Sequence, residues 1–355
     1  MSTFWRRRRD DAGGVEGDSP RDLLARADQL ERCGRGLEAI DLLTLANRRE
    51  RHDDIERRLV RLRNAAFAEL DASAGLESWP PEAPELFGGV VGLPEIAAAD
   101  LNAGAVRSGI LGHGALIVRG LIPPARVAQL IDDIDETFAA QDKFFDGAGH
   151  AQTAPWFVPF QCESEYPIGP TRRWVRGGGG VLTVESPRAL FDVLDAFEDA
   201  GLAGCLSEYL GERPVLAAKK FTLRRVPLAQ TADWHQDGAF LGRDIRAVNV
   251  WVALSPCGED SPGLDVVARR MPDIAPTGTE GAWFDWSVGA PVVDRVAEGA
   301  PIQRPIFEAG DAMLFDDMLL HRTAIDPEMT RERYAIESWF FAPSRYPGDQ
   351  IPVTF

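Results

Sequence analysis

Residues 234–254, WHQDGAFLGRDIRAVNVWVAL, join a His-x-Asp motif to an apolar run that is typical of a β-strand. His235 and Asp237 are two positions apart, and residues i and i+2 of a strand point to the same side. We therefore expect the two side chains to face one point, with Gln236 turned away from it. An imidazole and a carboxylate together are ligands that suit non-haem Fe(II).

The chain from Val215 onward consists mostly of short strand-like segments, separated by turns such as residues 255–263. Residues 310–315 and 334–341 are two of these segments, and His321 lies between them. A barrel would bring His321 beside the His-x-Asp motif, and three ligands on one face would leave positions open for substrate and oxygen. We predict a mainly β fold with flanking helices, in which a double-stranded β-helix (jelly-roll, cupin-like) barrel follows an N-terminal helical hairpin.

This ordered series resembles the phytanoyl-CoA dioxygenase family of Fe(II)- and 2-oxoglutarate-dependent oxygenases. The helix, strand and helix that we expect at 93–110, 115–120 and 123–140 resemble the entry to the same family, so the resemblance covers about residues 88–345. It implies Fe(II) as cofactor, 2-oxoglutarate as cosubstrate and O2 as oxidant. The implied reaction is hydroxylation of an unactivated C–H bond in a small-molecule or carrier-linked metabolite, with release of succinate and CO2.

The resemblance assigns the metal to His235, Asp237 and His321, which would be the catalytic residues. Related iron halogenases have a small residue in place of this carboxylate, so Asp237 favours hydroxylation over halogenation. The arginine that binds 2-oxoglutarate corresponds to Arg333, directly before a strand, with Arg331 as the alternative. A guanidinium matches a carboxylate through two parallel hydrogen bonds. Weaker expected contacts with the cosubstrate are Thr323, Trp251, Gln236, Lys220 and Thr222.

The segment Arg172-Arg173-Trp174-Val175-Arg176 precedes four glycines and is suited to a lid over the site. Its arginines could meet an anionic substrate, with Arg173 and Trp174 as contacts, or could pair with the protein's own acidic residues. Glu337 alternates with Arg333 on one strand face and is a further substrate contact that we expect. It could orient an amine or hydroxyl group, or could pair with an inward arginine.

The formal net charge of −17 over 355 residues argues against electrostatic binding to nucleic acid or to an anionic membrane. We find no run of about eighteen apolar residues, the length that a membrane span requires. The cysteines at 33, 162, 205 and 257 form no C-x-x-C motif. We expect them to be free thiols in a reducing compartment, the cytoplasm.

Four regions are expected along the chain. Residues 1–18, with four consecutive arginines and no apolar segment after them, would be a disordered tail. Residues 19–72 resemble a tetratricopeptide-like helical hairpin plus one helix, 73–87 form a Pro-rich linker, and 88–355 form the oxygenase domain. One hairpin cannot bury a core alone. It therefore packs on the catalytic domain, pairs with another subunit in a homo-oligomer, or holds a protein partner.

Two other functions are compatible with these residues. The chain could be a non-catalytic scaffold with a barrel and a helical segment, or an iron oxygenase that uses no 2-oxoglutarate. The complete His-Asp-His set argues against the scaffold, and Arg333 with Thr323 argues against the second alternative.

Overall fold

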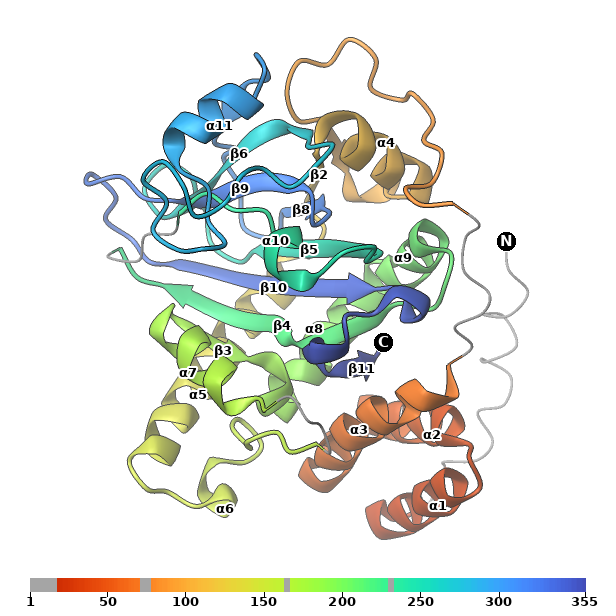
Figure 1. The fold of residues 1–355 in the computed structure, drawn as a ribbon. Helices are drawn as coiled ribbons and strands as arrows, with labels where there is room; N and C mark the ends of the chain where they lie inside the picture. The colour runs from red at the N-terminus through yellow and green to blue at the C-terminus, as the bar shows by residue number, and fades with distance from the viewer. Residues whose placement is uncertain (1–17, 71–77, 163–166, 229–232) are drawn as a thin grey trace.

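Two facing β-sheets form the centre of the molecule (Figure 1), and the predicted barrel with flanking helices is confirmed. The computed structural model describes residues 18–70, 78–162, 167–228 and 233–355, so residues 1–17 of the expected tail and 73–77 of the expected linker lie outside it. The larger sheet has the order β1-β2-β8-β5-β10-β4-β11, with β3 also paired to β4, and the smaller sheet has the order β7-β6-β9. The strands of the larger sheet are β1 Glu95–Ala97, β2 Ala115–Arg119, β3 Gly180–Leu182, β4 Val215–Val226, β5 Ala247–Ala253, β8 Ala312–Phe315, β10 Arg333–Phe341 and β11 Pro352–Thr354. Those of the smaller sheet are β6 Gly263–Arg270, β7 Ile302–Gln303 and β9 Leu319–Ala324.

Helices α5, α8 and α9 cover the outer face of the larger sheet, and α11 lies beside the smaller sheet (Figure 1). The helices of the described chain are α1 Pro20–Arg32, α2 Gly36–Arg49, α3 Asp53–Ala65, α4 Ala103–His113, α5 Pro124–Phe145, α6 His150–Thr153, α7 Gly169–Gly177, α8 Pro187–Asp199, α9 Leu202–Leu210, α10 Gly238–Leu241 and α11 Ala290–Val296. The helix expected at 93–110 was wrong in its first part. Residues 95–97 form β1, parallel to β2, and α4 begins only after Asn102, whose side chain accepts a hydrogen bond from the Ala105 amide.

The two faces of the larger sheet bury different sets of side chains. On β10, Ile336 and Phe340 face the helices, whereas Ala335 and Trp339 face the smaller sheet and fill the barrel. This alternation follows from the two-residue period of a strand. Arg333 and Glu337 share the inward face of β10 with Ala335 and Trp339, so a guanidinium and a carboxylate are directed into the barrel.

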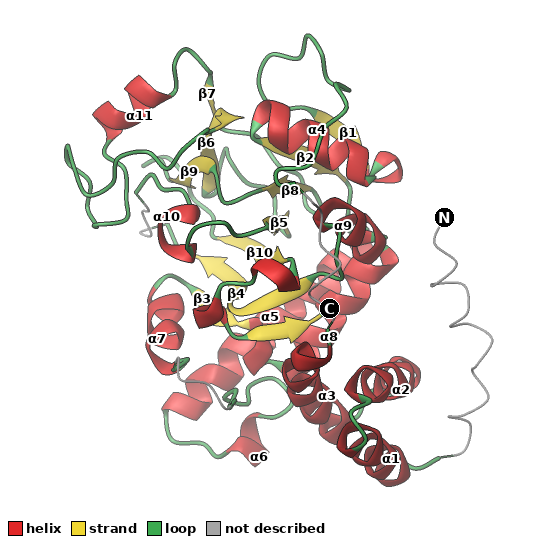
Figure 2. Cartoon of the chain, turned by 45° about the vertical axis from the view of Figure 1, so that its right-hand side comes forward, coloured by secondary structure: helices red, strands yellow, loops and turns green. Residues whose placement is uncertain are grey.

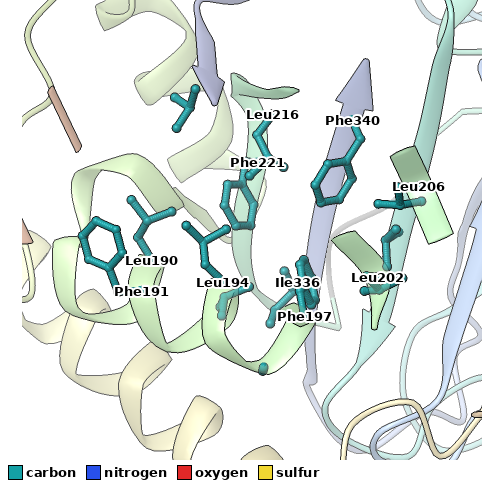
Figure 3. Close-up of a cluster of buried hydrophobic side chains, with 14 of the residues drawn as sticks. Leu190, Phe191, Leu194, Phe197, Leu202, Leu206, Leu216, Phe221, Ile336 and Phe340 are labelled. Carbon is teal, nitrogen blue, oxygen red and sulfur yellow. The ribbon is translucent and has the colours of Figure 1, made fainter. Parts of the chain in front are cut away.

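The hydrophobic layer outside the sheet holds the barrel wall in place. Figure 3 shows side chains of α8 and α9 packed against those of β4 and β10. The labelled members of this layer are Leu190, Phe191, Leu194, Phe197, Leu202, Leu206, Leu216, Phe221, Ile336 and Phe340. Since β10 carries Arg333 on its opposite face, this packing also fixes the position of a predicted site residue.

The N-terminal helices pack on the catalytic part of the same chain, which is the first of the three arrangements that we considered. Figure 2 shows α3 beside α8, with α1 and α2 on the outside. Arg48 pairs with Asp195 at 2.7 Å and with Glu198 at 2.8 Å, and the Asn64 side-chain amide donates to the Pro352 carbonyl at 2.8 Å. The apolar side chains of the three helices belong to the same cluster as those of α8 and β4.

An acidic side chain, Asp133 of α5, is buried where α5, α8 and the N-terminal segment meet. Its Oδ2 has no hydrogen-bond partner in the part of the chain that the structure describes. Burial, together with the charge of Asp192, raises the pKa of Asp133 to about 7, although Arg51 and Arg188 act in the opposite direction. Ionisation of Asp133 therefore costs stability in the folded state.

We expect Asp133→Asn to raise the melting temperature strongly at about pH 8.5 and much less at about pH 5. Because the folded-state pKa lies above the ordinary value, the contribution of Asp133 to stability is full below the unfolded pKa and is lost as the pH rises through about 7. Thermal unfolding at both pH values measures the effect. Exposed Asp132→Asn is the matched control, and an equal gain for both variants at both pH values would contradict the assignment.

Candidate active site

His235 and His321 lie directly opposite each other on two neighbouring antiparallel segments of the chain. The His235 amide donates to the His321 carbonyl at 2.9 Å, and the His321 amide donates to the His235 carbonyl at 3.0 Å. The two imidazole centroids are 4.4 Å apart. His321 is part of β9, so the prediction that it arrives on a neighbouring strand is confirmed.

Asp237 reaches the same point by a different route from the one that we predicted. The β pairing stops after His235, and Asp237 has helical dihedral angles (φ −62°, ψ −27°) and directly precedes α10. The expectation of one strand through both residues is therefore wrong. Gly238 allows this turn, because a Cβ there would lie 2.8 Å from the Asp317 carboxylate.

The side chains of His235, Asp237 and His321 converge. One potential ligand atom of each lies within 4.8 Å of the others, and His321 Nε2 is 3.6 Å from Asp237 Oδ2. Two imidazole nitrogens and one carboxylate oxygen form the donor set of a 2-His-1-carboxylate facial triad. The donor types and their separation fit a divalent ion of the iron class.

Backbone carbonyls fix which nitrogen of each histidine can bind a metal. His235 Nδ1 is 2.9 Å from the Asp233 carbonyl, and His321 Nδ1 is 3.0 Å from the Leu319 carbonyl. A carbonyl only accepts, so Nδ1 carries the proton and Nε2 keeps its lone pair. Burial, and then the neighbouring His235, lower the pKa of His321 to about 4, which keeps this imidazole neutral.

Lys220, the inward lysine of β4, holds the carboxylate of the triad. Its Nζ donates to Asp237 Oδ1 at 2.9 Å and lies 4.2 Å from the centroid of the Phe240 ring. Burial raises the pKa of Asp237, but the opposing effects, of which the charge of Lys220 is the largest, outweigh it, so the pKa lies below its ordinary value. Asp237 is therefore ionised and ready to bind a cation.

Gln236 was expected near the cosubstrate, and its contacts give it a different role. Its Nε2 donates to the Met318 carbonyl at 3.0 Å and to the Asp273 carbonyl at 3.2 Å, and its Oε1 accepts from the Ala275 amide at 2.7 Å. The side-chain amide is fully buried and engaged with the backbone. Gln236 thus ties the segment between the ligands to two neighbouring loops.

Arg333 is a buried cation without a carboxylate partner among the residues that the structure describes. It is 2% exposed, and its Nη1 donates to the carbonyls of Gly263 at 2.9 Å and Pro262 at 3.2 Å. Its Nε has no hydrogen-bond partner in the described chain, and burial lowers the pKa of Arg333 to about 10. By contrast, Arg331 is exposed and pairs with Asp260 at 3.0 Å. The geometry therefore separates the two arginines, and Arg333 fits an incoming carboxylate.

The other predicted cosubstrate contacts lie on strands around Arg333. The Arg333 guanidinium carbon is 5.4 Å from the centroid of the Trp251 ring, and Trp251 is opposite Glu337 in the sheet. Thr222 is opposite Glu337 on the other side, and its hydroxyl donates to the Glu337 carboxylate at 3.4 Å. Thr323 is half-buried on β9, in the smaller sheet.

Two of the three arginines of the predicted lid pair with the protein's own acidic residues. Arg172 pairs with buried Glu185, and Arg176 pairs with Asp142 at 2.7 Å. Arg173 is exposed on α7 and makes no ion pair in the described part of the chain. Trp174 is 64% exposed, and its ring meets two aromatic rings from a distant loop.

Several site residues were missed in the sequence. Phe240 and Trp286 contact the His235 ring, Phe284 stacks on Trp286, and Asp233 holds the loop that contains Phe284 and Trp286. The cluster Trp283-Phe284-Asp285-Trp286 was the available signal, because three aromatic residues in a loop region are unusual unless they contact something. No periodic pattern connects it with residues 234–237.

The sequence model for phytanoyl-CoA dioxygenase (PhyH) matches residues 111–325, which is more than half of the chain and includes the three converging side chains. The chain belongs to the phytanoyl-CoA dioxygenase family. It is therefore a non-haem iron, 2-oxoglutarate-dependent dioxygenase, since enzymes of this family generally depend on Fe(II) and 2-oxoglutarate. The resemblance noted in the sequence is confirmed.

One of the solved structures that the chain matches is that of AviO1 from Streptomyces viridochromogenes Tue57. It is 16% identical in sequence, the match covers 70% of this chain and 98% of AviO1, and the TM-score is 0.41. No curated protein sequence matches the chain. Within the described residues, no helix is both long enough and apolar enough to span a membrane.

Proposed function

We propose that this dioxygenase hydroxylates an unactivated C–H bond of a small-molecule or carrier-linked metabolite and converts 2-oxoglutarate and O2 to succinate and CO2. The observation that carries the proposal is the convergence of His235, Asp237 and His321 within 4.8 Å, with both Nδ1 atoms engaged by carbonyls. Hydroxylation is the favoured outcome because Asp237 supplies the carboxylate ligand.

In this proposal His235 Nε2, His321 Nε2 and an Asp237 oxygen hold Fe(II). When bound, the iron supplies the one-electron and O2 chemistry that no side chain provides. Lys220 keeps Asp237 charged and oriented through its 2.9 Å hydrogen bond, as partners of metal ligands generally do. The protein otherwise orients the substrate and excludes water.

We assign the far carboxylate of 2-oxoglutarate to Arg333. Its burial and its lack of a carboxylate partner in the described chain support this assignment, because an isolated buried cation is costly without an anion. Trp251 borders the Arg333 guanidinium, and Thr323 is retained as the hydroxyl partner. Lys220 is assigned to Asp237, and Thr222 to Glu337, instead of to the cosubstrate.

The two alternatives are less well supported. A scaffold protein would not need two imidazoles that both carry the proton on Nδ1 and lie beside an ionised carboxylate. An iron oxygenase that uses no 2-oxoglutarate would not need a buried guanidinium such as that of Arg333, which pairs with no carboxylate in the described part of the chain. The cytoplasm remains the proposed location, because all four cysteines are free thiols. The intramolecular packing of α1–α3 gives no support to an oligomer through residues 19–72.

Anaerobic titration of the purified protein with Fe(II) and then with 2-oxoglutarate tests the function. We expect stoichiometric iron binding, followed by a weak visible charge-transfer band when 2-oxoglutarate is added. Absence of iron binding would favour the scaffold, and iron binding without the band would favour the oxygenase that uses no 2-oxoglutarate. Release of succinate across a substrate library would then identify the substrate.

A further inference from the structure

Four aromatic side chains from three distant segments meet at one side of the triad. We call Trp174 of α7, Phe240 of α10, and Phe284 and Trp286 of the loop before α11 the aromatic wall. Phe284 and Trp286 are stacked with centroids 4.9 Å apart, and the Trp174 ring lies 5.9 Å from Phe284 and 6.4 Å from Trp286. Phe240 completes the wall at 5.6 Å from Trp286.

The wall directly adjoins one of the proposed metal ligands. The Trp286 ring is 5.6 Å from the His235 imidazole in an edge-to-face arrangement, and the Phe240 ring stacks 6.3 Å from the same imidazole. A molecule that lies on the wall is therefore next to the proposed iron position. This proximity makes the substrate the natural occupant of the surface.

The outer part of the wall is exposed although it is strongly apolar. Trp174 is 64% exposed and Phe284 is 40% exposed. Large aromatic side chains that gather at the surface beside a site mark a place where an apolar ligand is bound. A flat ring can stack on such faces over a large area without loss of shape complementarity.

Hydrogen bonds that Asp233 accepts hold the loop of the aromatic wall in place. Asp233 Oδ2 accepts from the Trp283 amide and from the Ser287 hydroxyl, both at 2.7 Å, and the Val288 amide donates to the Trp234 carbonyl at 2.7 Å. The carbonyl of the same Asp233 accepts from His235 Nδ1. One residue thus positions both the loop of the wall and a metal ligand, so the wall is formed before any ligand arrives.

The charges near the wall indicate the sign of the ligand. The Lys220 ammonium already occupies a face of Phe240, which disfavours a second cation there. Arg224, on the inward-facing side of β4, makes no ion pair within the described residues, and a Cβ on Gly178, just after α7, would lie 3.7 Å from its Nη2. Exposed Arg173 adjoins Trp174 and is likewise without an ion pair there. Glu337, the inward carboxylate, accepts from Thr222 and lies within the field of Arg333.

We propose that the substrate is an organic anion with a planar ring, which stacks on the aromatic wall and directs its anionic group to Arg224. This inference rests on the proposed function, because it places the ring beside the proposed iron site. It names a substrate class from two independent features, the exposed aromatic faces and a cation that makes no ion pair with any residue that the structure describes.

Three probes test the class by calorimetry on the enzyme loaded anaerobically with Fe(II) and 2-oxoglutarate. They are 2-naphthoate, which has a ring and a negative charge, octanoate, which has no ring, and (2-naphthylmethyl)trimethylammonium, which has a ring and a positive charge. We expect 2-naphthoate to bind most tightly. Tighter binding of octanoate would contradict the inference that the substrate has a planar ring. Tighter binding of the ammonium would contradict the inference that the substrate is an anion. Absence of saturable binding by all three would overturn the whole proposal.

Two tryptophans of similar exposure provide a matched pair of variants. We expect Trp174→Ala to weaken 2-naphthoate binding about fivefold to tenfold, the usual loss for an aromatic contact. Trp283→Ala removes a ring that is 62% exposed outside the wall and is expected to leave the affinity unchanged. Equal losses for both variants would contradict the role of the wall.

Arg224→Gln distinguishes the contribution of the ligand's anionic group to binding from that of its ring. We expect it to weaken 2-naphthoate about tenfold and to leave neutral 2-naphthol unaffected, whereas Arg224→Lys restores most of the affinity. In all four variants of Trp174, Trp283 and Arg224 the charge-transfer band with Fe(II) and 2-oxoglutarate is expected to persist. Loss of the band in the unmodified enzyme would instead contradict the proposed function itself, so the two failures are distinguishable.

Discussion

Replacement of His321 with alanine is expected to abolish Fe(II) binding and to lower turnover at least about 100-fold, since loss of an outer partner alone costs about 10- to 100-fold. The variant removes one of three converging donors and leaves a nitrogen and an oxygen that cannot complete a facial triad. Anaerobic calorimetry with Fe(II) measures the binding, and succinate release measures the turnover.

His150 provides the control for this substitution. It is exposed on α6, and its only ring contact among the described residues is with Phe144. His150→Ala is expected to bind Fe(II) like the unmodified enzyme. Undiminished iron affinity in His321→Ala, with a correctly folded protein by circular dichroism, would remove the basis of the proposed metal site.

Replacement of Arg333 with methionine is expected to weaken 2-oxoglutarate binding by about 30-fold or more, the loss that follows when a desolvated charge pair is truncated. Binding of Fe(II) alone should remain, because Arg333 does not belong to the triad. The charge-transfer band at increasing 2-oxoglutarate concentration gives the affinity directly.

Arg333→Met also tests how Arg333 affects the thermal stability of the protein when no ligand is bound. The guanidinium is 2% exposed and has no carboxylate partner in the described chain, so its removal relieves a desolvation cost and offsets the loss of its bonds to two carbonyls. We expect an unchanged or higher melting temperature. Exposed Arg331→Met should leave the cosubstrate affinity unchanged, and a large drop in the melting temperature of Arg333→Met would assign Arg333 a structural role instead.

Much of the fold could be predicted because local patterns and tertiary structure agree. The alternation along residues 334–341 matches the two buried faces of β10, and the helical periodicity of residues 20–65 matches α1–α3. The helix expected at 93–110 was wrong because the apolar residues before Asn102 pair with β2 instead of forming helical turns. Such pairing depends on a partner that the local sequence does not reveal.

The ligand set could be predicted more readily than its geometry. Residue type and spacing pointed to His235, Asp237 and His321, although Asp237 arrives through a turn and not along a strand. The aromatic wall was missed because Trp174 and Trp286 meet only in the folded chain. The role of Gln236 also depends on tertiary structure, because its partners are backbone groups of remote loops.

The Nδ1 atoms of His235 and His321 donate hydrogen bonds to backbone carbonyls, and this has a consequence for evolution. Every amino acid brings the same carbonyl to positions 233 and 319, so drift at these two codons leaves the tautomers intact. In many metalloenzymes a carboxylate performs this task and can be lost in one mutational event. Here the main-chain conformation alone sets the orientation of both imidazoles. Side chains that determine substrate preference can therefore change while the metal-binding residues keep their arrangement.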